Sequence, residues 1–263
     1  MWKTWFGEVE EKNGDYAVKK TDDFVKAFKN SENLEPLPFN LLEVGLNVFK
    51  SPEDYYRTLR KIAIAVTEEE VERELKREDR YAILLLKALD KLNESINMLE
   101  EKLRDVEEVK ISEVTEEFRG SIDRLKALRR KIEKEIDEIV TKIAPNLSEI
   151  AGPLITARLL EKAGSLERLA FLPGSKIQIL GAEKSLYKAL ARMRRGKKAK
   201  TPKHGIIFLH PFIRTLPKRK RGKMARFMAA KLAIAARLDY FKGELEEKLA
   251  EEVRKKYEEL RRR

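Results

Sequence analysis

The sequence contains no cysteine and two histidines, His204 and His210. The absence of cysteine excludes disulfides, thiol catalysis and cysteine-ligated metal sites. A zinc site built on two histidines would need carboxylates to complete it, so we expect no metal site. Glycine (12) and proline (9) are scarce among the 263 residues, whereas 39% of the residues are charged, which is a composition typical of helix-rich soluble proteins.

Long apolar runs and catalytic motifs are missing as well. No stretch of about 18 uncharged apolar residues is present, which excludes a membrane-spanning helix. The first residues, Met1-Trp2-Lys3-Thr4-Trp5-Phe6, lack the apolar core of a signal peptide, so we expect a cytoplasmic protein without a membrane partner. Since the sequence has no P-loop, Gly-x-Ser-x-Gly or His-Glu-x-x-His motif, we expect no catalytic residue and no cofactor in this chain.

Acidic residues are missing from one long tract. Between Lys184 and Leu238 there is no Asp or Glu, while residues 192–226 carry 14 Lys and Arg. Residues 1–150 have a net charge of −7 and residues 151–263 one of +19, which together give the +12 of the chain. Because like charges on neighbouring helical turns repel, a tract of one sign suits a polyanionic partner. We interpret this half as an RNA or DNA surface; a generally basic or membrane-facing patch is the alternative.

Residues 1–66 are predicted to form a small α/β module. Trp2–Val9 and Tyr16–Lys19 have the composition of short strands, and they flank Asn13-Gly14-Asp15, a sequence typical of tight turns. Ser51-Pro52 predicts the start of a helix, with serine as the cap and proline at the first helical position.

Residues 67–144 are predicted to form an antiparallel coiled-coil hairpin that begins at the capping-box sequence Thr67-Glu68-Glu69-Glu70. Two apolar seams with heptad spacing carry this prediction. The first comprises Leu85, Leu89, Leu92, Ile96, Leu99, Leu103 and Val106, and the second comprises Ile111, Phe118, Leu125, Ile132 and Ile139. Such a hairpin often packs against a copy of itself, so we expect a homodimer formed through Leu92, Ile96, Leu99 and Leu103; a purely intramolecular hairpin is the alternative.

Pro145 ends the hairpin and opens an all-helical region that we assign to residues 145–243. Ser148–Gly164 and Lys223–Tyr240 are predicted helices within it, and Arg194–Lys203 is a basic loop. Residues 244–263 are expected to form a basic, charged C-terminal helix or tail.

Motifs in this region resemble the Nop domain of the scaffold proteins in box C/D RNA-guided methylation particles. They cover about 100 residues in the order found in that family. The matching stretches are Ala144-Pro145-Asn146-Leu147-Ser148, Gly152-Pro153-Leu154, Ala157-Arg158-Leu159, Ala163-Gly164-Ser165-Leu166, Leu172-Pro173, Ile177–Lys184, Pro202-Lys203-His204-Gly205, Arg221–Arg226 and Lys231–Phe241. With the coiled coil just upstream, the chain is similar to a compact archaeal-type member.

The resemblance implies a mainly α-helical, non-catalytic scaffold with an α/β N-terminal module, a coiled-coil hairpin and a Nop domain. It implies that the Nop domain binds a box C/D guide RNA together with a small kink-turn-binding protein of ribosomal-protein type. The N-terminal module would dock fibrillarin, which holds S-adenosylmethionine and methylates the ribose 2′-hydroxyl of the target RNA, and the coiled coil would pair two scaffolds. A splicing-type Nop protein and an RNA-modifying enzyme with its own site are the alternatives.

The resemblance also implies RNA-binding residues. In the family, the Gly-Ala-Glu-Lys segment faces the RNA–protein junction, which makes Lys184 a candidate phosphate contact and Gln178 a polar one. His210 resembles a histidine that stacks on an extruded base in the splicing branch. The full candidate set is Gln178, Lys184, Lys188, His204, His210, Arg221, Lys223 and Arg226.

This sequence departs from the family in two places. The insertion that family members carry at the tip of the coiled coil, with an Arg-Glu-Trp-Tyr segment, is absent, so the hairpin is short. The N-terminal module is also shorter than usual, so fibrillarin docking follows from its position and not from matched residues.

Overall fold

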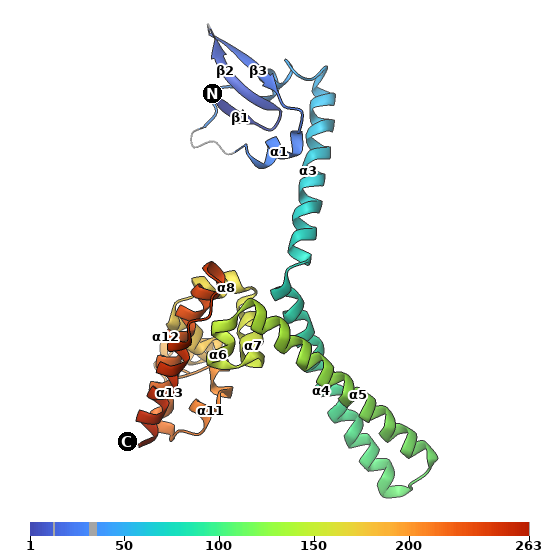
Figure 1. The fold of residues 1–263 in the computed structure, drawn as a ribbon, viewed down its shortest axis with the longest axis vertical. Coiled ribbons are helices and arrows are strands. Elements are labelled where there is room, and N and C mark those ends of the chain that lie inside the picture. Colours follow the sequence, from blue (N-terminus) through green and yellow to red (C-terminus); the bar gives the residue numbers. More distant parts are fainter. Residues whose placement is uncertain (13, 32–35, 263) are drawn as a thin grey trace. The chain divides into compact units, whose positions relative to one another are not determined.

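The computed structural model describes residues 1–12, 14–31 and 36–262. The chain divides into two compact units, Met1–Lys76 and Arg77–Arg263. The described residues are mainly α-helical, with one small sheet in the N-terminal unit (Figure 1), which confirms the predicted fold class.

The sheet of the N-terminal unit has three antiparallel strands in the order β1 (Trp2–Thr4), β2 (Gly7–Lys12) and β3 (Asp15–Lys20). The prediction of one strand over Trp2–Val9 is wrong, because the chain reverses between Thr4 and Gly7 and pairs Trp2 with Val9. Gly7 is required at this reversal, since a Cβ there would lie 2.2 Å from the Lys19 carbonyl oxygen. Asn13 of the expected turn lies outside the described residues.

In the part of this unit that the structure describes, three helices complete the fold. They are α1 (Phe24–Lys29), α2 (Leu41–Gly45) and α3 (Pro52–Leu75). The core between helices and sheet is aromatic: Trp5 stacks on Phe49 with ring centroids 5.1 Å apart, and its Nε1 donates to the Tyr55 hydroxyl at 3.2 Å. The predicted helix start at Ser51-Pro52 is confirmed, because the Ser51 hydroxyl accepts a hydrogen bond from the Asp54 amide.

The helix start predicted at Thr67 is wrong. Helix α3 passes through Thr67 without a break, and the Thr67 hydroxyl donates back to the Ala63 carbonyl instead of capping a new helix. Val66 packs against the core of the N-terminal unit, and Glu69 pairs with Lys29 at 2.7 Å. These contacts explain why the boundary between the units falls after Lys76 and not after residue 66.

The C-terminal unit begins with the hairpin of α4 (Glu78–Val109) and α5 (Glu113–Ile143), which lie side by side in Figure 1. Ile96 and Leu103 of the first seam are buried against Ile122 of α5, so the antiparallel pairing is confirmed within one chain. At the turn, Ser112 and Thr115 form a reciprocal capping box.

Among the described residues, nine helical elements follow the hairpin. They are α6 (Pro145–Ala151), α7 (Pro153–Ala163), α8 (Leu166–Phe171), α9 (Gly174–Ile179), α10 (Glu183–Arg194), the 3₁₀ helix η1 (Ile206–Leu209), α11 (Pro211–Arg214), α12 (Lys218–Phe241) and α13 (Glu247–Arg262). The predicted helix Ser148–Gly164 is in fact two helices, because Gly152 adopts a φ of 82° ahead of Pro153. The Ala-rich helix α12 begins at Lys218, five residues before the predicted start.

The C-terminal helix α13 is part of the core and not a tail. Its residues Leu249, Ala250 and Val253 are buried against the core that surrounds α12. Asn146 of α6 binds the segment just before this helix. Its Nδ2 donates to the Glu244 carbonyl at 2.7 Å, and its Oδ1 accepts from the Glu246 amide at 2.6 Å. A domain boundary at residue 243 is therefore wrong.

The hairpin is fixed to the helices that follow it. Arg158 on α7 forms two hydrogen bonds with Asp90 on α4, at 2.7 and 3.1 Å. Asp79, the second residue of α4, accepts from the Leu166 amide and so caps α8. Although burial alone would raise the pKa of Asp79, hydrogen bonds from Arg77, Leu166 and Arg80 lower it overall.

Candidate RNA-binding surface

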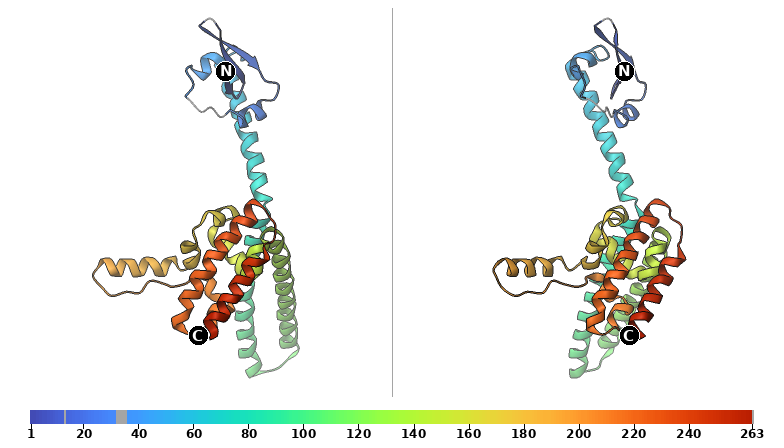
Figure 2. Two further views of the ribbon diagram at one scale, coloured as in Figure 1. Left: turned by 60° about the vertical axis from the view of Figure 1, so that its left-hand side comes forward. Right: turned by 90° about the vertical axis from the view of Figure 1, so that its left-hand side faces the viewer.

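A basic arm projects from the C-terminal unit. It consists of α10 and the return segment 195–203, and both views of Figure 2 show it as a tan helix and loop that extend away from the other helices of its unit. Among the α10 residues, Ala189 is the buried one. The exposed residues Lys184, Lys188, Arg192 and Arg195 are spaced by four, four and three positions, so they form one basic line along the arm.

The base of this arm is closed by three hydrogen bonds. The Gly205 and Ile206 amides donate to the carbonyls of Gln178 and Leu180, each at 2.8 Å. The side-chain Nε2 of Gln178 donates to the Lys203 carbonyl at 2.6 Å. A Cβ at Gly205 would lie 1.9 Å from the Leu180 oxygen, so only glycine permits this approach. Gln178 therefore holds the arm together, which is a different role from the predicted RNA contact.

Arg221 and His204 also have partners within the fold. His204 stacks on Phe208 with ring centroids 4.4 Å apart, and the Arg221 guanidinium lies 5.5 Å from the same Phe208 ring. Arg221 further donates to the carbonyls of Leu216 and Arg214, at 2.8 and 3.0 Å. Partial burial lowers the pKa of His204, and the nearby Arg221 adds to this effect. Both side chains thus stabilise the segment that follows the arm.

His210 is buried within the fold, and its stacking on an extruded base stays a prediction. Its Nδ1 accepts a hydrogen bond from the Phe212 amide at 3.1 Å and so caps α11. Phe212 also contacts the imidazole edge to face, with centroids 4.7 Å apart. Burial lowers the pKa of His210, although a hydrogen bond with the Ile150 backbone opposes the shift. The hydrogen bond and the ring contact thus hold His210 at the start of α11.

Lys223 and Arg226 remain exposed on α12, as expected of phosphate contacts. They line a hollow of about 450 Å³ together with Phe227 and Lys256 of α13. The ammonium groups of Lys231 and Lys256 lie 5.7 and 5.9 Å from the Phe227 ring centroid. Lys231 pairs with Glu252 and Lys256 pairs with Glu259, so Lys223 and Arg226 are the cations of this hollow that are best placed for an anionic ligand.

Sequence reasoning missed the outer residues of the arm as individual candidates. The segment past Lys188 contributes Arg192, Arg195, Lys197, Lys198 and Lys200, which line two shallow hollows with neighbouring alanines. The helical spacing from Lys184 onward was the signal that could have identified Arg192 and Arg195. Lys184, Lys188, Lys223 and Arg226 are the predicted residues that the structure leaves available to RNA.

The four residues predicted to mediate dimerisation lie on the hairpin in two environments. Ile96 and Leu103 are buried between α4 and α5, so they stabilise the hairpin itself. Leu92 and Leu99 are partly buried and pack against the same core. Self-association through these residues stays a prediction.

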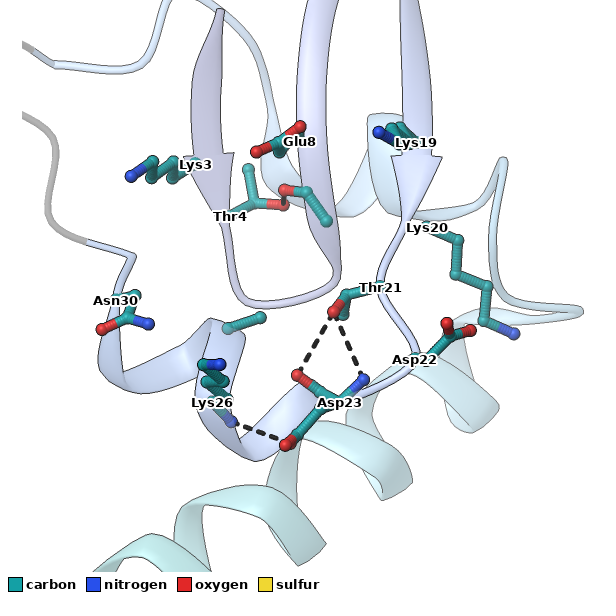
Figure 3. Close-up of a pocket in the computed structure, with 12 residues that line it drawn as sticks. Lys3, Thr4, Glu8, Lys19, Lys20, Thr21, Asp22, Asp23, Lys26 and Asn30 are labelled. Carbon is teal, nitrogen blue, oxygen red and sulfur yellow. Dashed lines mark hydrogen bonds between the residues drawn. The ribbon is translucent and has the colours of Figure 1, made fainter.

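The N-terminal unit carries a concave site of about 430 Å³ between the strands and α1 (Figure 3). Lysine and acidic side chains line it, and Asp23 and Thr21 form hydrogen bonds at the start of α1. Asp23 accepts from the Lys26 amide at 2.9 Å, and the Thr21 hydroxyl accepts from the Asp23 amide at 3.3 Å. Among the described residues, no group of three or more His, Cys, Asp or Glu could hold a metal ion, and no helix is long and apolar enough to cross a bilayer.

Known proteins resemble the chain over most of its length. The Nop family profile, described as "snoRNA binding domain, fibrillarin", matches residues 43–259. A chain of the solved structure described as the crystal structure of a fibrillarin/Nop5p complex is 52% identical, with a TM-score of 0.60 over 98% of this chain and 99% of that one.

Two curated relatives match a shorter part. A NOP5 family protein of Methanocaldococcus jannaschii is 42% identical over 151 residues, which are 57% of this chain and 35% of the relative. Human nucleolar protein 56 is 35% identical over 144 residues, which are 55% of this chain and 23% of that protein. The matched stretches thus span about a third or less of these relatives. Because the family profile covers residues 43–259, from α2 to α13, the chain belongs to the Nop family.

Proposed function

We propose that the chain is a non-catalytic scaffold of a box C/D ribonucleoprotein, which bridges fibrillarin to a guide RNA bound by a kink-turn-binding protein. The observation that carries this proposal is the 52% identity to a chain of the fibrillarin/Nop5p complex over 98% of this chain. That match includes the N-terminal unit, whose residues 1–42 precede the family profile. It therefore supports a fibrillarin-docking part as well as an RNA-binding part.

The RNA-binding part is the C-terminal unit. The basic line of the arm and the hollow at Lys223 and Arg226 offer cations at separate points, as a folded RNA backbone requires. In this proposal the guide RNA recognises the bases of the target, and the scaffold only positions the methyltransferase. The scaffold holds the methyltransferase site against one ribose, so the reaction no longer depends on a chance encounter. This positioning can lower the activation free energy of methylation by several kcal/mol.

S-adenosylmethionine belongs to fibrillarin in this proposal, and the chain itself holds no cofactor. Pairing of two scaffolds through the edge of the hairpin would space two methyltransferases along one guide. The assembly would act in the cytoplasm of an archaeal cell, whereas relatives such as human nucleolar protein 56 are named for the nucleolus.

Reconstitution of 2′-O-methylation tests the proposal. The reaction contains fibrillarin, the kink-turn-binding protein, a box C/D guide, its target RNA and labelled S-adenosylmethionine, with and without this chain. We expect label in the target only when the chain is added. A target with its 2′-hydroxyl removed at the guided ribose is the matched control and should stay unlabelled. Label that does not depend on the chain, or none in its presence, would refute the scaffold role.

The same reaction separates the two alternatives. A splicing-type Nop protein would bind the RNA–protein complex but not fibrillarin, and the match of the N-terminal unit to the fibrillarin/Nop5p structure argues against it. An RNA-modifying enzyme would label the target without fibrillarin.

A further inference from the structure

Two polar contacts join the first turns of α4 to the helices that follow the hairpin. At the start of α4, the Asp79 carboxylate accepts hydrogen bonds from the Leu166 amide of α8 at 2.9 Å and from the Arg77 guanidinium at 2.9 and 3.1 Å. Three turns later, Asp90 accepts two hydrogen bonds from Arg158 of α7, at 2.7 and 3.1 Å. The two contacts lie about 16 Å apart along the helix, and we name their four side chains the brace.

Between the two contacts of the brace, α4 buries an apolar face. The core at this junction consists of Ala82, Leu86 and Leu89 of α4, Ile136 and Val140 of α5, and Ala157 of α7. The hydrophobic effect is not directional, so it favours the burial of these side chains in any orientation that covers them. Apolar residues at every third or fourth position repeat along a helix, and a tilted or shifted α4 would still be covered. The core therefore stabilises the junction without fixing one orientation of the hairpin.

The brace supplies the direction that the apolar core lacks. An arginine that forms two hydrogen bonds with one carboxylate requires a defined geometry of the two side chains. Arg158 and Asp90 keep 33% and 40% of their side-chain surface exposed, and ion pairs with this exposure contribute little to stability. This pair is therefore better suited to orient the hairpin than to stabilise it.

The brace controls two distant points of the chain. Helix α4 continues from Asp90 to Val109, over about 28 Å, so a tilt of about 5° at Asp90 would move the tip of the hairpin by about 2.5 Å. At the other end, Asp79 holds Arg77, the first residue of the C-terminal unit, where the chain leaves for the N-terminal unit. Reacting groups must meet within about 3 to 3.5 Å, so displacements of this size separate productive from unproductive geometry.

We propose that the brace is a positioning device, which holds the hairpin in one orientation on α7 and α8. Resting on the proposed function, the brace also sets where the methyltransferase meets the guided ribose, because the partner scaffold and the N-terminal unit are both attached through α4. Asp79, Asp90 and Arg158 act through the orientation of α4 and touch neither RNA nor S-adenosylmethionine. They are therefore positioning residues and not catalytic ones.

Distances between two spin labels test the orientation of the hairpin without RNA or partner proteins. The chain has no cysteine, so labels can be attached through Val109→Cys at the tip of the hairpin and Ile234→Cys on α12, two positions that are 86% and 41% exposed. Labelled chain is diluted with unlabelled chain, so that each measured pair lies within one molecule. Pulsed electron paramagnetic resonance then gives the distance distribution, and we expect a single narrow one while the brace is intact.

Arg158→Gln should widen this distribution about twofold, because the bidentate contact is lost. The reversed pair Asp90→Arg/Arg158→Asp should narrow it again. Asp79→Asn/Arg158→Gln removes charge from both contacts and should widen it further, while asparagine keeps an acceptor for the cap of α8. Arg254→Gln is the matched control, because it removes a similar ion pair, with Glu149 at 2.6 Å, away from the junction.

A distribution as narrow in Arg158→Gln as in the wild type would overturn the proposal. This single variant replaces a partly exposed side chain, so it decides the question even where the double variant fails to fold. Circular dichroism of each variant shows whether it is folded.

Reconstituted methylation tests the second part of the proposal. With the guide complex at a saturating concentration, Arg158→Gln should transfer methyl groups about ten-fold more slowly, while its affinity for that complex stays that of the wild type. The reversed pair should recover the rate. A widened distance distribution with an unchanged rate would overturn the link to methylation. If the wild type itself gave no label that depends on the chain, the proposed function would fail, whereas the distance measurement would still decide whether the brace orients the hairpin.

Discussion

Both histidines of the chain are at least partly buried, and this burial makes the free energy of unfolding depend on pH. Burial lowers the pKa of His210 and of His204 in the fold, while an unfolded chain gives histidine its ordinary pKa near 6.5. Below that ordinary pKa the unfolded chain binds more protons than the folded one. Their contribution to stability is therefore complete above about pH 6.5 and is lost as the pH falls below it.

His210→Asn should reduce this pH dependence. Asparagine also caps helices, so the bond to the Phe212 amide can be kept while the titrating group is removed. We expect the free energy of unfolding of the wild type to fall between pH 7.5 and 5.5, by at most about 1.4 kcal/mol per pH unit for each histidine. Denaturant unfolding of the wild type and the variant at the two pH values measures this decrease in the free energy of unfolding, which should be smaller in the variant.

His204→Gln is the matched control for that comparison. Since His204 is less buried than His210, its replacement should remove a smaller part of the pH dependence. Burial raises the pKa of Asp239, so this residue makes stability fall as the pH rises, which is the opposite of the effect of the histidines. Because Asp239 is present in both variants, its effect cancels when they are compared. An unchanged pH dependence in His210→Asn would contradict the role given to burial.

At the level of single elements, the sequence predicted what depends on local periodicity. The heptad spacing of the seam that contains Ile96 and Leu103 predicts the hairpin, because an apolar residue at every third or fourth position over several turns needs a facing helix to cover it. The start at Thr67 failed because a capping-box sequence also occurs inside helices, where the hydroxyl bonds to the preceding turn. The packing of α13 escaped notice, since its buried residues form a narrow stripe in a highly charged helix.

Candidate site residues were predicted less well than elements, because their roles depend on contacts distant in sequence. Gln178 bonds to Lys203 and Arg221 lies over Phe208, neither of which local spacing reveals. Lys184 and Lys188 were found because a basic line on an exposed helix is visible in the sequence itself.

The arm should account for a defined part of the salt dependence of RNA binding. Lys188→Gln/Arg192→Gln removes two exposed cations from its basic line. Each lost phosphate contact lowers the slope of log K against log salt by about 0.7 to 0.9, so we expect a decrease of about 1.5. Fluorescence anisotropy with guide RNA at several salt concentrations measures the slope. Lys91→Gln/Lys134→Gln on the acidic hairpin is the control, and an unaltered slope in the arm variant would exclude the arm from the RNA surface.

At the scale of the whole molecule, the hairpin has two distinct sets of apolar residues. Ile96, Leu103 and Ile122 are buried inside one chain, so they can hold the hairpin without a partner. Leu92 and Leu99 pack against this core but are only partly buried, so a second copy could bury the rest of their surface. Apolar side chains that one hairpin covers only in part are what a symmetric pair of hairpins can bury.

Leu92→Glu/Leu99→Glu should therefore turn a dimer into a monomer, and circular dichroism shows whether the hairpin stays folded. Charges at the edge of a paired surface would face their symmetry mates and lose hydration there, while in a monomer they stay in contact with water. Light scattering should give the variant a mass of 30.6 kDa and the wild type twice that value, with equal helix content by circular dichroism. Tyr187→Glu, on the arm, controls for the loss of an exposed apolar residue and should leave the dimer intact. If the wild type is already a monomer, the hairpin does not mediate self-association. The RNA would then have to set the spacing of the two methyltransferases in the proposed particle.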